Sequence, residues 1–317
     1  MRGWPVGRRR RAASGSIEQM PAVSDIGLES GDRHPTMAPR QAQPVDSAAE
    51  ALAHITPLII TYNEAPNIAR SLDKLRWARR IVVIDSGSTD ETATIVQSYP
   101  QAVLIRHPFS DFASQCNYGL TQVDSDWVLS LDADYELSDE LARELASLDY
   151  ASGPAGYRAR FVYKIHGRSL RASLYPPRTV LYQKDKASYR NEGHGHRVTI
   201  DGEVRPLRGV IYHDDRKPLS QWVASQLRYA ANEADYLLSP REGPVTRTDK
   251  LRLMGWPTPI GAFFYTLFIK GCVLDGWPGW YYTLQRVFAE TLIALVLLER
   301  RLGHKAKSGT DKDRARS

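Results

Sequence analysis

The sequence is poor in cysteine, and this scarcity excludes several kinds of site. It has 317 residues and only two cysteines, Cys116 and Cys272, which lie far apart and outside any CxxC or Cys/His ligand spacing. A disulfide framework and a structural zinc site are therefore not expected, and a reducing compartment is the default. No GxGxxG motif follows the first predicted strand, which argues against a dinucleotide oxidoreductase.

The N-terminal segment lacks the apolar stretch of a secretory signal. The four arginines at 8–11 are followed by small and polar residues. Residues 1–52 show no apolar periodicity, so we expect a disordered basic tail, and Met20 or Met37 could be the true start. The formal net charge of +6 suits an anionic membrane or a phosphorylated substrate. Nothing beyond this basicity indicates a nucleic-acid partner.

The sequence also lacks an uninterrupted apolar run of the roughly 20 residues that a spanning helix needs. Segments 260–274 and 287–298 are the most apolar, but they contain Lys270 and Glu290. Between them lies an aromatic segment, 276–282, which we expect to be a loop; Trp and Tyr favour the membrane–water interface. We expect an interfacial helical hairpin that docks on a membrane. A buried helical pair or a dimer interface is the alternative.

What the sequence does contain is an alternation of short apolar strands with amphipathic helices. This order predicts an open, mostly parallel α/β sheet with right-handed crossovers, to which hairpins at 157–165 and 180–189 are added. The predicted strands are 57–62, 81–84, 102–105 and 127–131, and the predicted helices are 67–77, 90–99, 112–123 and 138–148, with Asp90 and Ser138 as N-caps.

This pattern divides the chain into four parts. The basic tail at 1–52 precedes a catalytic domain at 53–217. A helical C-terminal region follows at 218–305, and a disordered tail is expected at 306–317. Ligands of such sheets bind beyond the carboxyl ends of the strands. The functional residues are therefore expected in the loops of the catalytic domain.

Polar loops follow three of the predicted strands. Asn63 and Glu64 follow the first strand, Asp85 to Ser88 the second, and Asp132-Ala133-Asp134 the fourth. The parallel arrangement would bring all three loops to one crevice. Asp132 and Asp134 could hold Mg²⁺ or Mn²⁺, whose remaining positions would be taken by phosphate oxygens. Solvated loop carboxylates or helix caps are the alternative.

The second loop has the composition of a base-binding turn. Asp85 could accept a hydrogen bond from the imide N–H of uracil or bind ribose hydroxyls, and Gly87 permits close backbone approach. Thr61, Asn63 and Glu64 could border the same base and ribose. Asp, Ser and Gly are also ordinary turn residues, so a purely structural turn is the alternative.

Three motifs in this order resemble glycosyltransferase family 2. They are Ile59-Ile-Thr-Tyr-Asn-Glu64, Val83-Ile-Asp-Ser-Gly-Ser-Thr-Asp-Glu-Thr92 and Leu131-Asp-Ala-Asp134. The likeness covers about residues 55–300 and includes the subgroup that builds lipopolysaccharide core and related envelope glycans. It implies the GT-A nucleotide-diphospho-sugar transferase fold, a membrane-associating C-terminal region and an inverting transfer, usually from a UDP-sugar.

The resemblance also implies roles for individual residues. Asp85 would contact uracil, Asp132 the ribose and the metal, and Asp134 the metal, while Thr61 and Glu64 would line the nucleotide pocket. Asn117 occupies the position of a helix residue that often faces the nucleotide. A polar residue on the helix surface is the alternative for Asn117.

An inverting transfer needs a general base for the acceptor hydroxyl. Relatives carry an acidic residue after the added hairpin, often beside a histidine; here that region holds Glu192, with His194 and His196 as alternatives. It departs from the usual His-Glu pair. A second charged cluster at 213–217 offers Asp214 or Asp215 as a further candidate base.

Three basic residues are candidates for binding phosphate. Arg216 and Lys217 could hold the donor diphosphate or an anionic acceptor, and Arg178 could do the same. A solvated helix start before Pro218 is the alternative for the first two.

The function predicted from the sequence is transfer from a nucleotide sugar to a lipopolysaccharide-type or lipid-linked glycan by a peripheral enzyme on the cytoplasmic side of the inner membrane. Two other functions remain open. A nucleotidyltransferase usually carries a Gly-rich loop and a Lys near the first strand, and 61–68 has neither. A non-catalytic scaffold with the same fold would show no metal-dependent UDP binding.

Overall fold

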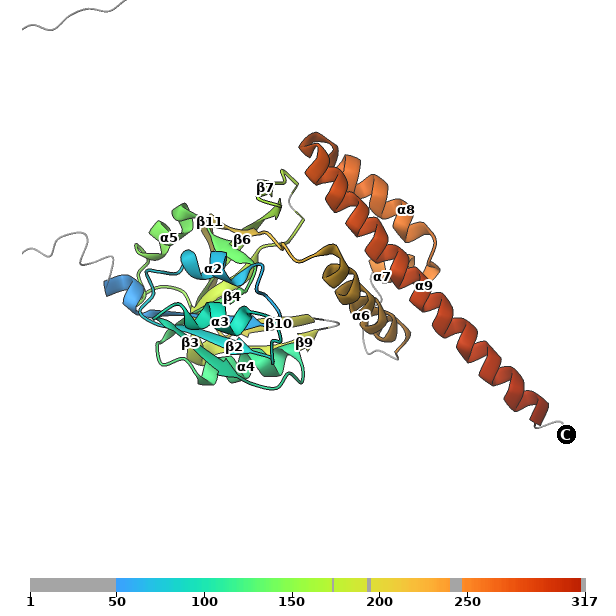
Figure 1. Cartoon of the computed structure of the whole chain (residues 1–317), viewed down its shortest axis with the longest axis horizontal. Coiled ribbons are helices and arrows are strands. Elements are labelled where there is room, and N and C mark those ends of the chain that lie inside the picture. Colours follow the sequence, from blue (N-terminus) through green and yellow to red (C-terminus); the bar gives the residue numbers. More distant parts are fainter. Residues whose placement is uncertain (1–49, 173, 193–194, 240–246, 315–317) are drawn as a thin grey trace, which may run out of the picture. The chain divides into compact units, whose positions relative to one another are not determined.

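The computed structural model describes residues 50–172, 174–192, 195–239 and 247–314, all within one compact unit, 42–317. Four parallel strands form its first half in the order β3-β2-β1-β4 (Figure 1). Their bounds are β1 Ile55–Thr61, β2 Ile81–Asp85, β3 Ala102–Arg106 and β4 Trp127–Asp132. All four lie within a residue or two of the predicted positions.

Helices cover both faces of this half-sheet, which explains the continuous apolar strands. Successive residues enter different cores: Ile59 packs on one face and Leu58 on the other. The first face is covered by α2 (Ile68–Asp73) and α3 (Thr92–Gln97), and the second by α4 (Phe112–Thr121); α5 (Asp139–Leu145) joins the first core but packs on the other half of the sheet. Ser138 caps α5 as predicted, since its side chain accepts a hydrogen bond from the Leu141 N–H.

Asp90 is not the N-cap of α3. Glu91 occupies that backbone position. The Asp90 carboxylate instead accepts hydrogen bonds from the N–H groups of Thr92 and of Ala65, which lies in the loop after β1. The acid therefore connects two loops at the sheet edge as well as supporting the first turn of its helix.

The second half of the sheet is mixed. Here β8 (Arg178–Gln183) runs antiparallel to both β4 and β6 (Gly156–Ile165), while β11 (Val204–His213) is parallel to β6. β5 (Tyr135–Leu137) closes the edge against β11, and β7 (Arg168–Ser169) pairs with β6. β9 (Ala187–Glu192) and β10 (Gly195–Ile200) form a separate hairpin. The predicted α/β class with added hairpins is confirmed.

The C-terminal region is helical, as predicted, but its helices differ from the expectation. They are α6 (Leu219–Leu238), α7 (Arg247–Met254), α8 (Pro257–Phe264) with a π-helical turn η2 (Tyr265–Ile269), a short η3 (Cys272–Asp275) and α9 (Trp277–Arg314). Trp277 begins α9, so the aromatic segment expected as a loop is mostly helical. α9 also continues through Arg314 into the tail expected to be disordered, because no proline interrupts a helix already formed.

One helical segment, Trp277–Leu302, has the length and mean hydropathy of a membrane-crossing helix. The sequence prediction had divided this part of the chain into a loop and an apolar run too short to span. Length and composition alone do not distinguish a spanning helix from a buried helix of a soluble protein.

Candidate functional site

Strand register brings the predicted loops to one edge of the sheet. Thr61 pairs with Asp85 across β1 and β2, and Ile60 pairs with Asp132 across β1 and β4. Because the three strands are parallel, their carboxyl ends lie side by side. The Thr61 hydroxyl is buried there without a hydrogen-bond partner among the described residues. A buried unpaired hydroxyl at this edge is consistent with a missing ligand atom.

Asp85 forms a tight turn at this edge. Its buried carboxylate accepts hydrogen bonds from the N–H and the hydroxyl of Ser88. Gly87 has φ = +92°, which other residues rarely adopt. Asn63 joins the two loops: its N–H donates to Ser88 Oγ (2.9 Å), and its side-chain oxygen accepts from the Thr89 N–H (2.8 Å). The Asn63 side chain thus has a structural task in the pocket wall.

The DxD segment meets a histidine that the sequence prediction left without a role. Asp134 Oδ2 lies 2.9 Å from Nε2 of His213, the last residue of β11. Burial raises the pKa of Asp134, but His213 lowers it by a larger amount. The pKa of Asp134 therefore lies below its ordinary value. Burial lowers the pKa of His213, and Asp134 more than reverses this effect. Each partner therefore favours the charged form of the other. The sequence contains a signal for His213, because it is a polar residue that ends a strand, like Asp85 and Asp132.

The residues at this edge fit a divalent cation that is shared with a substrate. No group of three or more Asp, Glu, His or Cys side chains suited to a metal occurs among the described residues. Mg²⁺, however, commonly takes one or two protein ligands and completes its shell with water and substrate phosphates. Asp134 could supply one ligand, and His213 a second once its imidazole has lost its proton; Asp132 lies close enough to act electrostatically on His213.

Lys217 lies among three carboxylates beside this pair. Its ammonium forms an ion pair with Glu64 and lies 3.9 Å from Asp215. Burial lowers the pKa of Lys217, but Glu64 and Asp215 raise it above the ordinary value, so the ammonium keeps its charge. Burial, together with the negative charge of Asp134, raises the pKa of Glu64 to about 7 despite Lys217. The single positive charge of Lys217 therefore cannot neutralise all three nearby carboxylates.

One face of α2 holds these loops in place. The Arg70 guanidinium donates to the Asp214 carbonyl (2.8 Å) and pairs with the Glu136 carboxylate. Ser71 Oγ donates to the Ala133 carbonyl in the DxD segment (2.7 Å). Asn67 contributes to the same network, bonding Glu64, Asp215 and the Arg216 N–H. Asn67, Arg70 and Ser71 have helical spacing and form the α2 clamp.

Asp214 is poorly placed to act as a base. Its carboxylate is fully buried, and Oδ2 accepts from Arg216 (2.7 Å), the Gly167 N–H (3.0 Å) and Arg70 (3.2 Å). Oδ1 is buried without a hydrogen-bond partner among the described residues, so the arrangement favours a structural role for Asp214 over proton transfer to an acceptor hydroxyl. Arg216, expected to bind diphosphate, is engaged by the same carboxylate. Lys217 remains the cation of this cluster that is closest to the site.

Two further predicted residues differ in outcome. Arg178 stacks over Tyr175, with its guanidinium carbon 4.5 Å from the ring centroid, near enough to Asp132 to feel its charge. It therefore belongs to the site edge. The Asn117 amide makes two 3.0 Å hydrogen bonds with the backbone of Tyr189 in β9. These bonds attach the β9–β10 hairpin to α4, and a contact of Asn117 with the nucleotide stays a prediction.

The predicted bases lie at the tip of the β9–β10 hairpin. The backbone places Glu192 opposite Gly195, and His196 opposite Asn191. His194 and the side chains of Glu192 and His196 lie outside what the structure describes. The identity of the base therefore stays a prediction.

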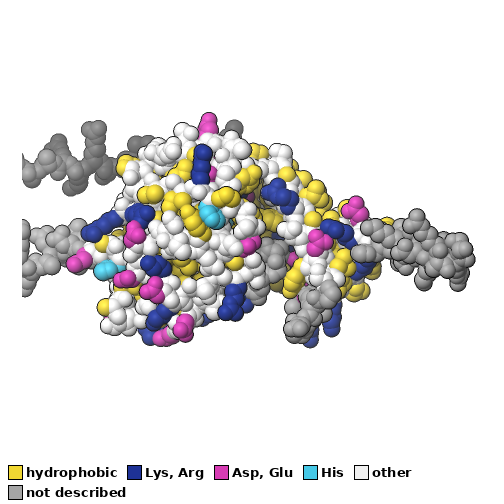
Figure 2. Space-filling model, turned by 90° about the horizontal axis from the view of Figure 1, so that it is seen from below, with side chains coloured by type: hydrophobic (Ala, Val, Ile, Leu, Met, Phe, Trp, Pro, Cys, Tyr) yellow, Lys and Arg dark blue, Asp and Glu magenta, His cyan; other side chains and the backbone are white. Residues whose placement is uncertain are grey.

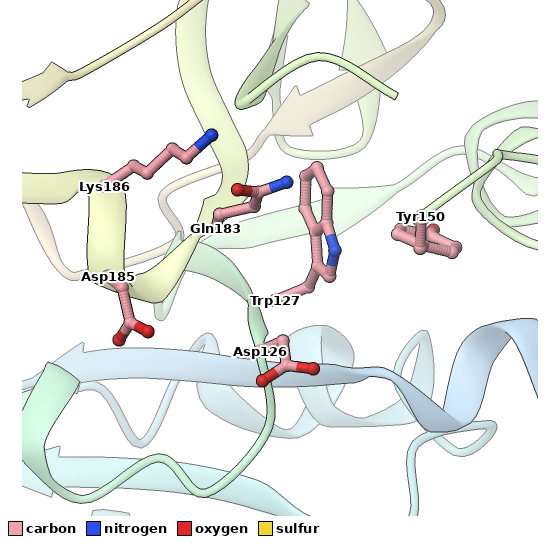
Figure 3. Close-up of a pocket in the computed structure, with 6 residues that line it drawn as sticks. All are labelled: Asp126, Trp127, Tyr150, Gln183, Asp185 and Lys186. Atoms are coloured by element: carbon pink, nitrogen blue, oxygen red, sulfur yellow. The ribbon is translucent and has the colours of Figure 1, made fainter. Parts of the chain in front are cut away.

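A separate cavity of about 320 Å³ lies elsewhere (Figure 3). Its lining includes Asp126 and Trp127, at the start of β4, and Gln183 at the end of β8. Since the DxD segment follows the other end of β4, this cavity opens at the opposite edge of the sheet. It is not part of the candidate site.

Comparison with known proteins agrees with this geometry. The family described as "Glycosyl transferase family 2" matches residues 57–199. An uncharacterized glycosyltransferase of Rickettsia bellii is 27% identical over 253 residues, covering 75% of this chain and 84% of that protein. The lipopolysaccharide core biosynthesis glycosyltransferase LpsC of Rhizobium meliloti is 28% identical over 199 residues, covering 60% and 74%.

Among solved structures, that of Staphylococcus aureus TarS 1–349 covers 78% of this chain and 91% of its own, at 15% identity and a TM-score of 0.40. A score of this size adds nothing to the argument. The matched region begins within β1, ends within β10 and contains the DxD segment. Residues 57–199 therefore form a domain of glycosyltransferase family 2, with the GT-A fold.

Proposed function

We propose that this glycosyltransferase moves a sugar from a UDP-sugar to a hydroxyl of a lipopolysaccharide-type or lipid-linked glycan, with inversion at the anomeric carbon. The observation that carries the proposal is the meeting of Asp85, Asp132, Asp134, His213 and Lys217 at one edge of a family 2 domain. The likeness to a lipopolysaccharide core enzyme supports the acceptor class.

The donor would lie across the carboxyl ends of β1, β2 and β4. Asp85 would accept the uracil imide N–H through the lone pairs that Ser88 leaves open, and Asp132 would bind the ribose. Lys217 and Arg178 would face the diphosphate. Asp134 and Asp132, with His213 in its neutral form, would hold Mg²⁺ or Mn²⁺, which would supply positive charge for the leaving diphosphate.

The acceptor hydroxyl would lose its proton to a group on the β9–β10 hairpin. Glu192 is the first candidate, and His194 and His196 are the alternatives. Asp214 is not proposed for this role, because its carboxylate is buried in ion pairs. A peripheral position on the cytoplasmic face of the inner membrane would bring such an acceptor to the site.

A donor screen tests the proposal without knowledge of the acceptor. The full chain is incubated with nucleotide sugars and Mg²⁺ or Mn²⁺, and the release of nucleoside diphosphate is measured. We expect slow hydrolysis of one UDP-sugar that stops with a chelator. Calorimetry with UDP and metal is the second measurement. If UDP fails to bind with either cation, the donor proposal is wrong and the scaffold alternative gains support.

A further inference from the structure

The C-terminal helices present an unusually apolar exposed surface. Ile260, Phe264 and Phe268 follow one another at four-residue spacing along α8 and η2, and each is more than half exposed. A matching row on α9 begins at Trp277 and continues with Trp280 and Leu284, also exposed. These six residues, together with Ile269 and Leu274, are named the aromatic surface.

The two rows adjoin. The Phe263 ring lies 5.3 Å from the ring of Phe264 and 6.2 Å from that of Trp280. Hydrophobic side chains also reach the surface among charged ones on the face shown in Figure 2. Soluble monomers rarely expose a continuous apolar patch of this extent, which indicates a partner.

The charges around the aromatic surface favour a lipid partner. Between Gly255 and Leu284 the only acidic residue is Asp275, whose side chain is 3% exposed and accepts the Arg171 N–H. Cations border the surface: Arg168 lies over Trp277, and Lys270 over Tyr265. Tryptophan, tyrosine and basic side chains without exposed carboxylates are the composition of a segment that sits in an anionic membrane interface.

The contacts of α9 argue against a bilayer crossing. Glu290, near the middle of the apolar segment, is paired with Arg252 of α7, which also binds Glu233 of α6. Further along, Arg300 pairs with Asp235 of α6, and the Arg301 side chain donates to the Leu253 carbonyl. A crossing would carry α6 and α7, with their exposed charges, into hydrocarbon, where unpaired charges are strongly unfavourable.

We propose that the aromatic surface inserts into the interfacial layer of an anionic lipid bilayer while α9 remains outside the hydrocarbon core. This inference rests on the proposed function and adds the element of the fold that contacts the membrane. The same element contacts the site: Tyr282 of α9 packs on Tyr163, whose ring lies 4.3 Å from His213. Docking would therefore hold the catalytic edge next to a lipid-linked acceptor.

Vesicle sedimentation of the full chain tests this proposal. Binding is compared for phosphatidylcholine vesicles with and without phosphatidylglycerol, using wild type, Phe264→Ser/Phe268→Ser and the control Leu227→Ser/Leu238→Ser. The control removes two exposed apolar residues of α6. We expect binding that needs the anionic lipid, falls roughly tenfold or more in the α8–η2 variant and is unchanged in the control. Bound protein should be released by alkaline carbonate, because α9 does not cross.

Three results would overturn the proposal. The first is equal binding by the wild type and the Phe264→Ser/Phe268→Ser variant. The second is retention of the protein after carbonate, which would indicate a spanning α9. The third is a wild-type protein that does not bind vesicles but forms a dimer in solution, while the variant is a monomer. That result would assign the surface to a second copy of the chain. Hydrolysis of the donor in solution is measured in parallel, so loss of docking with hydrolysis intact separates this proposal from the catalytic one.

Discussion

Two clusters of buried charge, one at the sheet edge and one in the C-terminal helices, are built on opposite principles. At the edge, Lys217 faces Glu64, Asp215 and the more distant Asp134, and the pKa of Glu64 rises to about 7 through burial and this crowding. In the helices, Arg252 lies between Glu233 and Glu290, each paired with it at 2.7 Å, and Arg286 pairs with Glu290 at 3.1 Å, so two cations face two acids. Burial lowers the pKa of Arg252, but the two acids raise it overall.

This difference distinguishes a functional site, at the sheet edge, from a charge cluster that holds helices together. Acids in excess of their fixed cations have an unfavourable energy that an incoming cation would relieve, and strongly perturbed groups of this kind concentrate at functional sites. The C-terminal cluster uses each of its charges to join three helices. Removal of a charge should therefore affect catalysis in the first cluster and stability in the second.

Asp134→Asn should show the largest effect. The amide keeps the shape and a hydrogen bond to His213 but loses the negative charge, so turnover should fall on the order of 10³-fold with the fold retained. Donor hydrolysis and circular dichroism measure both outcomes. Asp126→Asn, at the opposite end of the same strand, is the matched control and should be fully active. Near-normal turnover by a folded Asp134→Asn protein would remove the site assignment.

Arg252→Met should destabilise the helical region by about 3 kcal/mol, because it leaves two buried glutamates with too few cations. Urea unfolding followed by circular dichroism gives the change. Arg300→Met removes an exposed pair from the same helices and should cost less than about 1 kcal/mol. Equal losses of unfolding free energy in the two variants would show that the buried cluster does not hold the helices together.

Glu64→Gln should flatten the dependence of stability on pH. A pKa raised from 4.5 to about 7 means that Glu64 contributes stability below pH 4.5, and this contribution is lost as the pH rises through 7. The loss is at most roughly 3 kcal/mol in the free energy of unfolding. Urea titrations between pH 4.5 and 7.5 should show a fall in wild type that is smaller in the variant. Glu140→Gln, an exposed change in α5, should behave like wild type.

Arg70→Met should cost about 2 kcal/mol, since Arg216 still neutralises Asp214. The α2 clamp positions the DxD and 213–217 loops, so donor hydrolysis should fall as well, with partial recovery in Arg70→Lys. Arg76→Met, an exposed change beyond the end of α2, should leave stability unchanged. Full hydrolysis by Arg70→Met would leave the clamp a purely structural role.

Local pattern was enough for the first half of the fold. β1, β2, β3 and β4 are apolar runs bounded by polar loops, and both faces of each are covered, so their positions could be predicted closely. The second half was harder, because β6 and β11 pair in parallel across nearly 50 residues. Such pairing depends on packing between distant segments. The periodicity of apolar residues along the sequence does not predict which strands will pair.

The same limit applied to the site. Asp85, Asp132 and Asp134 could be predicted as site residues because each ends an apolar strand or lies just after one. Asn117 was assigned to the nucleotide because a polar helix residue looks the same whether it faces a ligand or a neighbouring strand. His213 had the right local signal, but only the β11–β5 pairing brings it to Asp134.

By itself the sequence determined the parallel half-sheet and the loops that carry the acids, because both follow from local apolar runs and the residues that end them. Tertiary structure alone decided that Asp214 is buried, that His213 faces Asp134 and that α9 is held by charged helices. These facts arise from contacts between residues far apart in the chain. The charge and exposure of such groups depend on which surfaces fold against them.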